Sequence, residues 1–280
     1  MTVLPQTPLE RIRTHLVGLK MSYALEALDA CVRRLEDGEL SALGFLDELL
    51  GEEHATRETR RIKSSLMTAR LTRIKTLEGF DFSFQPSLDK NRILALAELA
   101  FIERREVVHL LGPPGTGKSH LAIALGVASV KAGKSVYFAT LAEIIDSLAK
   151  AEREGKLAQR IGFITRSALL IIDEVGYLPV PKGGANLFFQ LINARYERGA
   201  VILTSNRGFS EWGEVFGDNV VAAALLDRLL HHAIVIEIAG NSYRLREHAK
   251  LVPANLRLPP ISAPPKPKRR RGRPAKIQET

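Results

Sequence analysis

The 280-residue sequence has very little cysteine and no long apolar run, and each absence excludes a class of protein. Cys31 is the only cysteine, which excludes an internal disulfide framework and a cysteine-rich zinc site. No apolar run approaches the roughly 18–20 residues needed to span a bilayer. Residues 1–9 lack both the cationic start and the apolar core of a signal peptide. We therefore expect a cytoplasmic protein with no membrane partner.

The positive charge of the chain is unevenly distributed. Of a formal net charge of +9, residues 253–280 contribute +7, from eight basic residues and one acidic residue. Like charges among prolines repel each other and cannot form a core, so we expect 248–280 to be a basic tail, disordered until it meets a polyanion. Within it, Arg271-Gly272-Arg273-Pro274 resembles an AT-hook, in which Arg271 and Arg273 would contact the DNA minor groove. A nonspecific polycation or a solubilising end is the other interpretation.

Residues 9–75 show helical periodicity and no strand-like alternation. A first helix ends at Gly38, a second begins at Ser41, and a third is expected from about His54 to Lys75. The third helix is rich in arginine, and its candidate DNA contacts are Arg57, Arg60, Arg61 and Arg73. The same arginines also fit a solvated helix face, and the sequence leaves both interpretations open. We expect residues 1–78 to form a helical domain that binds DNA or a partner.

From residue 93 onward, strands and helices alternate. Five short apolar runs are typical of strands that are covered on both faces, and they lie at 107–111, 135–139, 168–172, 200–204 and 233–238. Helical stretches lie between them, at 119–132, 141–150, 185–198 and 219–230. This alternation predicts a doubly wound α/β domain with a five-stranded, mostly parallel sheet, over residues 79–247. Its first residues, 79–86, are interpreted as a connector.

A complete G-x-x-x-x-G-K-[ST] sequence lies between the first strand and the helix that follows it. Its residues are Gly112, Pro113, Pro114, Gly115, Thr116, Gly117, Lys118 and Ser119. The glycines let the backbone curl so that N–H groups point at phosphate oxygens, and the helix dipole adds positive potential there. We expect Lys118 to reach the β- and γ-phosphates of ATP and the Ser119 hydroxyl to bind Mg²⁺. The next residue, His120, is included among the nucleotide contacts.

Polar residues follow two of the predicted strands. Asp173 and Glu174 end the apolar run 169–172, at the edge of the sheet where ligands bind. We expect Asp173 to hold Mg²⁺ and Glu174 to polarise the attacking water, a division that favours hydrolysis. Asn206, after the next strand, is placed to orient that water beside the γ-phosphate. A simple asparagine turn is the other interpretation of Asn206.

Two arginines and a histidine pair stand near the end of the domain. Arg228 lies near the end of a helix, where in an oligomer it can enter a neighbour's site and stabilise γ-phosphate charge. Arg244 can contact the nucleotide of its own subunit. Surface ion pairing is the alternative for each arginine. His231-His232 has no third ligand candidate nearby in the sequence, so we interpret the pair as structural rather than as a metal site.

Taken in order, these segments resemble the IstB-like helper ATPases of bacterial insertion sequences, which are related to the helicase loader DnaC and to AAA+ initiator proteins. The resemblance runs from about Leu9 to Arg246. The matching segments include 75–82, 112–121, 170–179, 195–199, 204–206, 211–212, 227–232 and 240–246. So many matches in order are more specific than the phosphate-binding loop alone.

The resemblance implies an AAA+ P-loop domain after a small all-α N-terminal domain, in the bacterial cytoplasm. It implies a homo-oligomer on double-stranded DNA with ATP sites at subunit interfaces, and a transposase encoded by the same element as partner. The implied activity is ATP hydrolysis with Mg²⁺, without strand cutting. Arg228 matches the trans-acting arginine and Arg244 the second sensor. The chain departs from the general AAA+ plan because little sequence after Ile238 is left for a helical lid.

Two other functions use the same ATPase core. A DnaC-type replicative helicase loader would bind a helicase hexamer and single strands. The segments 195–199 and 211–212 and the duplex-seeking tail favour the transposition helper over this loader. The other alternative is a nucleotide-gated DNA-binding scaffold in which ATP turnover is incidental.

Overall fold

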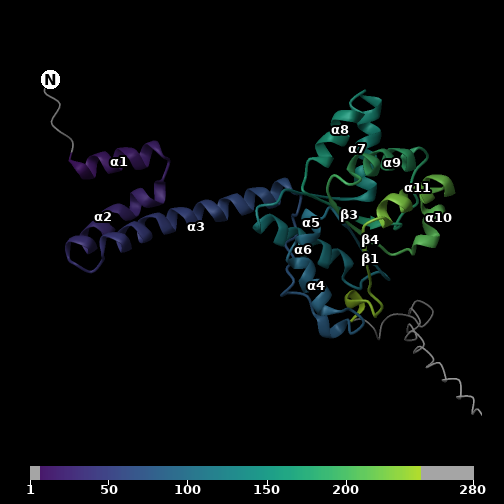
Figure 1. Ribbon diagram of the computed structural model, residues 1–280, viewed down its shortest axis with the longest axis horizontal. Coiled ribbons are helices and arrows are strands. Elements are labelled where there is room, and N and C mark those ends of the chain that lie inside the picture. Colours follow the sequence, from purple (N-terminus) through teal and green to yellow (C-terminus); the bar gives the residue numbers. More distant parts are fainter. Residues whose placement is uncertain (1–6, 247–280) are drawn as a thin grey trace, which may run out of the picture.

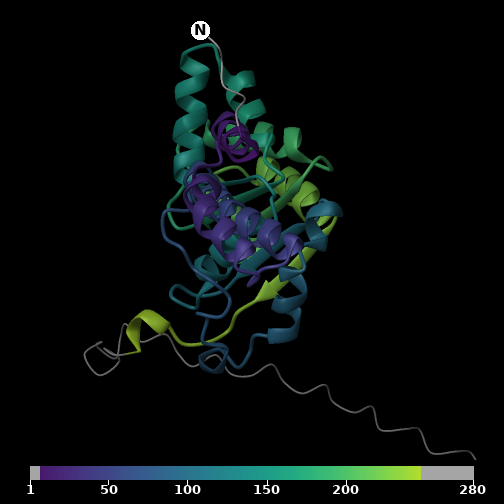
Figure 2. The same cartoon turned by 90° about the vertical axis from the view of Figure 1, so that its left-hand side faces the viewer.

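The structure is a computed structural model that describes residues 7–246 (Figure 1). It begins with three helices, which are α1 (Pro8–Gly18), α2 (Ser22–Glu36) and α3 (Ala42–Thr68). In Figure 1, α1 and α2 lie at the far end of α3, which runs from them to the α/β body. Figure 2 shows the molecule from the side of these helices, which lie in front of that body.

The helix boundaries in this part differ from the sequence prediction in three places, two of them before the end of α3. The first predicted helix is broken between α1 and α2, where Lys20 adopts a left-handed φ of 54°. This turn folds α1 back and buries Leu16 in a small core shared with α2 and α3. The break predicted before His54 is absent, because Gly51 lies inside the continuous α3. An interior glycine costs a helix roughly 1 kcal/mol, which the burial of Leu49 nearby offsets.

The body contains a five-stranded sheet in the order β2-β3-β4-β1-β5. The strands are β1 (Val107–Leu111), β2 (Val136–Thr140), β3 (Leu169–Val175), β4 (Ala200–Ser205) and β5 (Ala233–Glu237). Every neighbouring pair is parallel, which confirms the predicted α/β class and its five strands. The carboxyl ends of all five strands therefore lie at one edge of the sheet.

Helices cover both faces of this sheet. They are α4 (Lys90–Ala97), α5 (Ala100–Glu103), α6 (Lys118–Lys131), α7 (Leu141–Arg153), α8 (Leu157–Thr165), α9 (Gly184–Arg195), α10 (Trp212–Phe216) and α11 (Asn219–Leu230). No helix was predicted at α4, α5, α8 or α10, because their four to nine residues are too few to show a clear period. Within the described residues, no helix is both long and apolar enough to cross a membrane.

Successive residues of β3 pack into two separate cores, as the two-residue period of a strand requires. Leu170 and Ile172 join the core formed with α7, α8, α9, α10 and α11. Leu169 and Ile171 join the core formed with α4, α5 and α6 on the other face. The sheet is thus the middle layer of three, and both faces of β3 are apolar for this reason.

The end of α3 belongs to the second of these cores. Leu66 and Leu71 are buried there, and the Phe138 N–H of β2 donates to the carbonyl oxygen of Ala69 at 3.0 Å. The helix ends earlier than the predicted Lys75, because Arg70 adopts a left-handed φ of 64°. Since α3 ends inside the body, the division of the chain at residue 78 stays a prediction.

Candidate nucleotide-binding site

The backbone of the loop between β1 and α6 is tightly curled, and three glycines make this conformation possible. Gly112, Gly115 and Gly117 have φ angles of 148°, 80° and 99°, which L side chains rarely adopt. A Cβ on Gly112 would lie 2.3 Å from the carbonyl oxygen of Ile238. The Gly112 N–H donates to the Ser205 carbonyl at 3.1 Å, which ties the loop to the end of β4. This loop at a helix N-terminus is a concavity suited to anions.

The remaining loop residues stabilise this curl. The Thr116 hydroxyl donates to the carbonyl oxygen of Pro113 at 2.9 Å, and Thr116 is buried. Pro114 is exposed at the tip of the loop. Proline lacks an N–H, and at this exposed position outside any strand or helix its absence costs no ladder or helix hydrogen bond.

The Lys118 side chain is folded into the loop that it follows. Its ammonium donates to the carbonyl oxygens of Gly112 and Pro113, both at 2.7 Å. Burial lowers the pKa of Lys118 to about 8, the positive charge of Arg244 acts in the same direction, and the charge of Asp173 opposes both. Phosphate oxygens would replace the two carbonyls and favour the charged form of the lysine.

Two hydroxyl groups bind the carboxylate of Asp173. Ser119 Oγ donates to Asp173 Oδ1 at 2.8 Å, and Thr204 Oγ1 donates to the same oxygen. Asp173 is buried, so its carboxylate depends on these donors. The Ser119 hydroxyl and the Asp173 carboxylate are oxygen ligands of the kind Mg²⁺ prefers, and they fit such an ion beside the phosphate-binding loop.

Glu174 lies next to Asp173 in sequence but points to a different environment. The pairing of β3 with β4 shifts between Ile172 and Val175, and Glu174 has a left-handed φ of 62° within this irregularity. Its N–H donates to Thr204 Oγ1 at 3.1 Å, and its side chain is exposed. Thr204 therefore holds both acidic residues through one hydroxyl. In a regular strand, Asp173 and Glu174 would point to opposite faces of the sheet, and both faces are covered. The left-handed backbone at Glu174 instead directs its side chain to solvent.

Asn206 follows β4 directly, and its Oδ1 atom is buried without a hydrogen-bond partner in the part of the chain that the structure describes. The preceding residue, Ser205, accepts the hydrogen bond from Gly112 of the loop. An unpaired buried oxygen is rare in folded proteins and calls for a ligand or water. Asn206 is therefore available to bind at the edge of the phosphate-binding loop.

Two residues that the sequence did not assign to the site, Phe80 and Tyr243, contact the loop. Phe80 packs so closely that a Cβ on Gly117 would lie 2.5 Å from its ring, and the rings of Phe80 and His120 are 5.3 Å apart. His120 Nε2 lies 2.9 Å from the carbonyl oxygen of Thr76. From the other end of the body, the Tyr243 N–H donates to the Gly115 carbonyl at 2.9 Å. Sequence reasoning missed these contacts because they join residues far apart in the chain.

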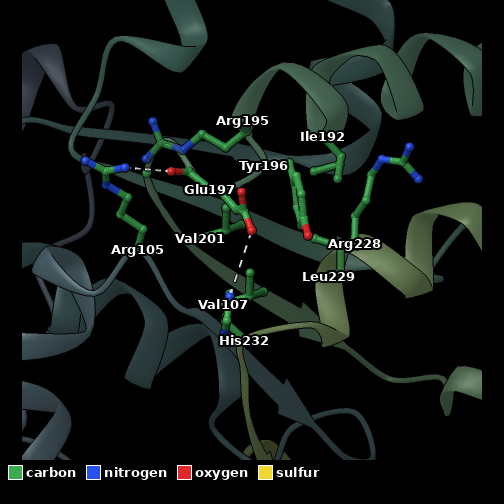
Figure 3. Close-up of a pocket in the computed structure, with 11 residues that line it drawn as sticks. Arg105, Val107, Ile192, Arg195, Tyr196, Glu197, Val201, Arg228, Leu229 and His232 are labelled. Atoms are coloured by element: carbon green, nitrogen blue, oxygen red, sulfur yellow. Dashed lines mark hydrogen bonds and ion pairs between the residues drawn. The ribbon is translucent and has the colours of Figure 1, made fainter.

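Arg228 lies at the opposite edge of the sheet, in a pocket beside Val107 and Val201 at the starts of β1 and β4 (Figure 3). Its Nε donates to Asn193 Oδ1 at 3.1 Å, and its guanidinium lies 4.7 Å from the ring centroid of Phe189. Since the phosphate-binding loop follows the other end of β1, the structure does not bring Arg228 to the site of its own chain.

The arginines of α3 have internal partners. Arg57 Nε donates to Glu53 at 2.7 Å, and Arg57 Nη2 donates to the carbonyl of Lys20 at 2.8 Å, so it ties α3 to the turn after α1. Arg60 donates to the hydroxyl of Tyr23 at 3.1 Å.

Arg61 forms two hydrogen bonds with Glu58, at 2.6 and 2.8 Å. Arg73 is exposed and has no hydrogen bond or ion pair within residues 7–246. Arg271 and Arg273 lie outside the described residues. Of the candidate DNA contacts that the structure describes, only Arg73 thus has no hydrogen bond or ion pair to another described residue.

Most of the chain is similar to known proteins. The sequence profile of the family described as IstB-like ATP binding protein matches residues 14–251. A protein named for ATP binding in insertion sequence IS21 of Pseudomonas aeruginosa is 47% identical over 244 residues, which is 87% of this chain and 92% of that protein. A counterpart in insertion sequence IS5376 of Geobacillus stearothermophilus is 42% identical, over 85% of this chain and 95% of that protein.

Solved structures are more distant. DnaA from Aquifex aeolicus bound to AMPPCP is 23% identical with a TM-score of 0.48, over 63% of this chain and 54% of that chain. The DnaI structure is 20% identical with a TM-score of 0.48, over 60% of this chain and 89% of that chain.

Proposed function

Because the chain belongs to the IstB-like ATP-binding proteins and has their AAA+ fold, we propose that it hydrolyses ATP and thereby regulates a transposase on duplex DNA. The observation that supports hydrolysis is that the adjacent carboxylates of Asp173 and Glu174 lie in different environments. Asp173 is buried against Ser119 of the phosphate-binding loop, whereas Glu174 is exposed beside it. One carboxylate is thus placed for the metal and the other for water.

In this proposal, Lys118 exchanges its hydrogen-bond partners when ATP binds. Lys118 leaves the carbonyl oxygens of Gly112 and Pro113 for the β- and γ-phosphates. Ser119 and Asp173 would hold Mg²⁺, which when bound neutralises charge on the phosphate oxygens. The N–H groups of the loop orient the phosphate chain through the helix dipole.

Glu174 is the general base of the proposed hydrolysis. The hydrogen bond from its N–H to Thr204 fixes the backbone of Glu174 and so limits where its carboxylate can lie. From there the exposed carboxylate can accept a proton from water. The unpaired Oδ1 of Asn206 is the second acceptor, and it orients the same water. Arg244 adds positive charge near Lys118 from within the chain.

Arg228 supports assembly into a homo-oligomer. It lies at the edge of the sheet opposite its own loop, so it can act on phosphate only in the site of a neighbouring subunit. A guanidinium supplied in this way stabilises charge that develops on the γ-phosphate. ATP would then favour assembly on DNA, and hydrolysis would release it.

The first experiment measures ATP hydrolysis with and without duplex DNA. We expect Glu174→Gln to keep ATP affinity within about threefold while turnover falls by roughly 10²-fold or more, because only the base is lost. Lys118→Ala should weaken ATP binding itself. Glu237→Gln, an exposed carboxylate on β5, is the matched control and should hydrolyse normally. Normal turnover by Glu174→Gln would refute the assigned role.

The second experiment mixes two inactive variants. Arg228→Ala retains a complete site but supplies no arginine, whereas Glu174→Gln supplies the arginine but has a defective site. If the sites are shared between neighbours, an equimolar mixture regains about a quarter of wild-type turnover, since one interface in four combines the intact halves. No recovery, with mixed oligomers verified by light scattering, would place Arg228 outside the site.

The third experiment addresses DNA. Arg73→Gln should weaken duplex binding and lower the slope of log affinity against log salt by about one, as expected for one lost phosphate contact. Arg61→Gln is the matched control, because Arg61 is already paired with Glu58. Preference for single strands and capture of a helicase instead of a transposase would favour the helicase loader.

A further inference from the structure

Three potential metal ligands meet beside the pocket that contains Arg228. Glu197 lies between α9 and β4, and His231 and His232 lie between α11 and β5. Figure 3 shows Glu197 and His232, joined by a dashed line. The sequence shows no third ligand near the histidine pair, but the fold brings one from 34 residues earlier in the chain. Within residues 7–246, no other three histidine, cysteine or acidic side chains come together in this way.

The distances fit a common metal ion. Glu197 Oε1 lies 3.7 Å from His231 Nδ1 and 4.0 Å from His232 Nε2, and the ligand atoms all lie within 4.8 Å of one another. Zinc binds nitrogen and oxygen at about 2.0–2.2 Å, so tetrahedral ligands lie about 3.3 Å apart. Small rotations of side chains that are about half exposed are enough to close this gap.

Tyr196 adds a group that can adjust to the ion. Its hydroxyl lies 2.8 Å from Nδ1 of His231. Glu197 is also within hydrogen-bonding reach of this hydroxyl. The hydroxyl thus has Glu197 as a second partner, to which it can turn when Nδ1 is needed as a ligand. Such partners orient the ligands of metal sites.

We propose that Glu197, His231 and His232 form a binding site for a divalent transition metal of the zinc class. Two imidazoles and one carboxylate favour zinc over Mg²⁺, which prefers oxygen ligands alone. Three protein ligands leave a fourth position for water or a group from another molecule. A bound ion would join the loop before β4 to the end of α11, three residues after Arg228. The site does not depend on the proposed ATPase function.

The test is equilibrium binding of Zn²⁺ to the full-length chain without nucleotide and with excess Mg²⁺, which occupies oxygen-rich sites. We expect one strongly bound zinc per chain, and at least tenfold weaker binding for His232→Ala and for Glu197→Gln. His54→Ala, an exposed histidine on α3, is the matched control and should bind zinc as the wild type does.

Folding is monitored separately, because His231 also bonds Tyr196. Circular dichroism should show unchanged helix content for His232→Ala and Glu197→Gln. Zinc should raise the melting temperature of the wild type and of His54→Ala but not of those two variants. Wild-type affinity in both cluster variants, or no saturable zinc binding by the wild type, would overturn the proposal.

Discussion

Nε2 of His109, in the middle of β1, lies 3.0 Å from the carbonyl oxygen of Leu229 at the end of α11. A carbonyl only accepts, so His109 is the donor and its buried Nδ1 is left without a partner among the described residues. Leu229 directly follows Arg228. The hydrogen bond therefore anchors the helix end that carries the proposed trans-acting arginine.

This arrangement predicts a loss of stability in acid. Burial lowers the pKa of His109 to about 4 from its ordinary 6.5. The unfolded chain therefore takes up a proton first, and stability that is complete above about pH 6.5 is lost as the pH falls toward 4. From about pH 7 to about pH 5, this group should remove about 2 kcal/mol from the free energy of unfolding.

Urea unfolding at the two pH values measures this contribution. His109→Leu should lose about 2 kcal/mol less than the wild type on acidification, whatever its stability at neutral pH. His15→Leu, which replaces an exposed histidine of α1, should behave as the wild type. An equal acid loss in His109→Leu would contradict the assignment.

Gly112 and Gly155 allow backbone strain to be separated from crowding. Both have positive φ angles, of 148° and 68°, but a Cβ on Gly155 would meet nothing within 4 Å. We expect Gly155→Ala to cost about 1 kcal/mol of stability with normal nucleotide affinity. Gly112→Ala should weaken binding of a fluorescent ADP analogue by at least about tenfold, because the new methyl group meets the Ile238 carbonyl and moves the loop. Equal nucleotide affinity in the two variants would exclude this explanation.

Thr204 is a positioning residue that the sequence did not single out. Its hydroxyl donates to Asp173 and accepts from the Glu174 N–H. Thr204→Val keeps the shape and removes both bonds, so ATP turnover should fall by roughly 10-fold to 100-fold, with a smaller change in ATP affinity. Thr204→Ser restores the hydroxyl and should recover most of the turnover. If the serine variant is as slow as the valine variant, packing and not hydrogen bonding explains the effect.

Arg195 is a buried cation whose hydrogen-bond partners are backbone carbonyl oxygens rather than a carboxylate. It is 2% exposed, its pKa of about 10 leaves it charged at neutral pH, and its nitrogens donate to the carbonyls of Thr165, Ser167, Ala168 and Ala200. Arg195→Met should destabilise the protein by about 3–5 kcal/mol in urea unfolding, since four carbonyl acceptors, one buried and three partly buried, lose their donor. The exposed Arg198→Met should change stability by less than about 0.5 kcal/mol. A small effect at Arg195 would mean that water replaces the guanidinium.

Much of the fold follows from local sequence. The apolar runs of β1, β3 and β4 are buried throughout, so their identity as strands does not depend on distant residues. The phosphate-binding loop is likewise encoded by consecutive residues from Gly112 to Ser119. The pairing of Ser119 with Asp173 is expected because parallel strands end at the same edge of a sheet.

The features that were missed depend on tertiary contacts. Thr204 acquires its position only when β3 and β4 pair with an irregular register. Arg195 looks like a surface residue at the end of a helix until the loops around it close. Glu197 joins the histidine pair because α9 and α11 pack side by side, which no spacing along the chain reveals. The break at Lys20 has the same origin, since it is set by packing of α1 on α2.

The continuous helix α3 has the geometry of a lever. Its 27 residues extend about 40 Å at 1.5 Å per residue, with α1 and α2 near one end and the core of the body at the other. A rotation of about 5° where α3 enters that core would move the far end by about 3–4 Å. A small rotation of α3 within the core of the body is thereby amplified at α1 and α2.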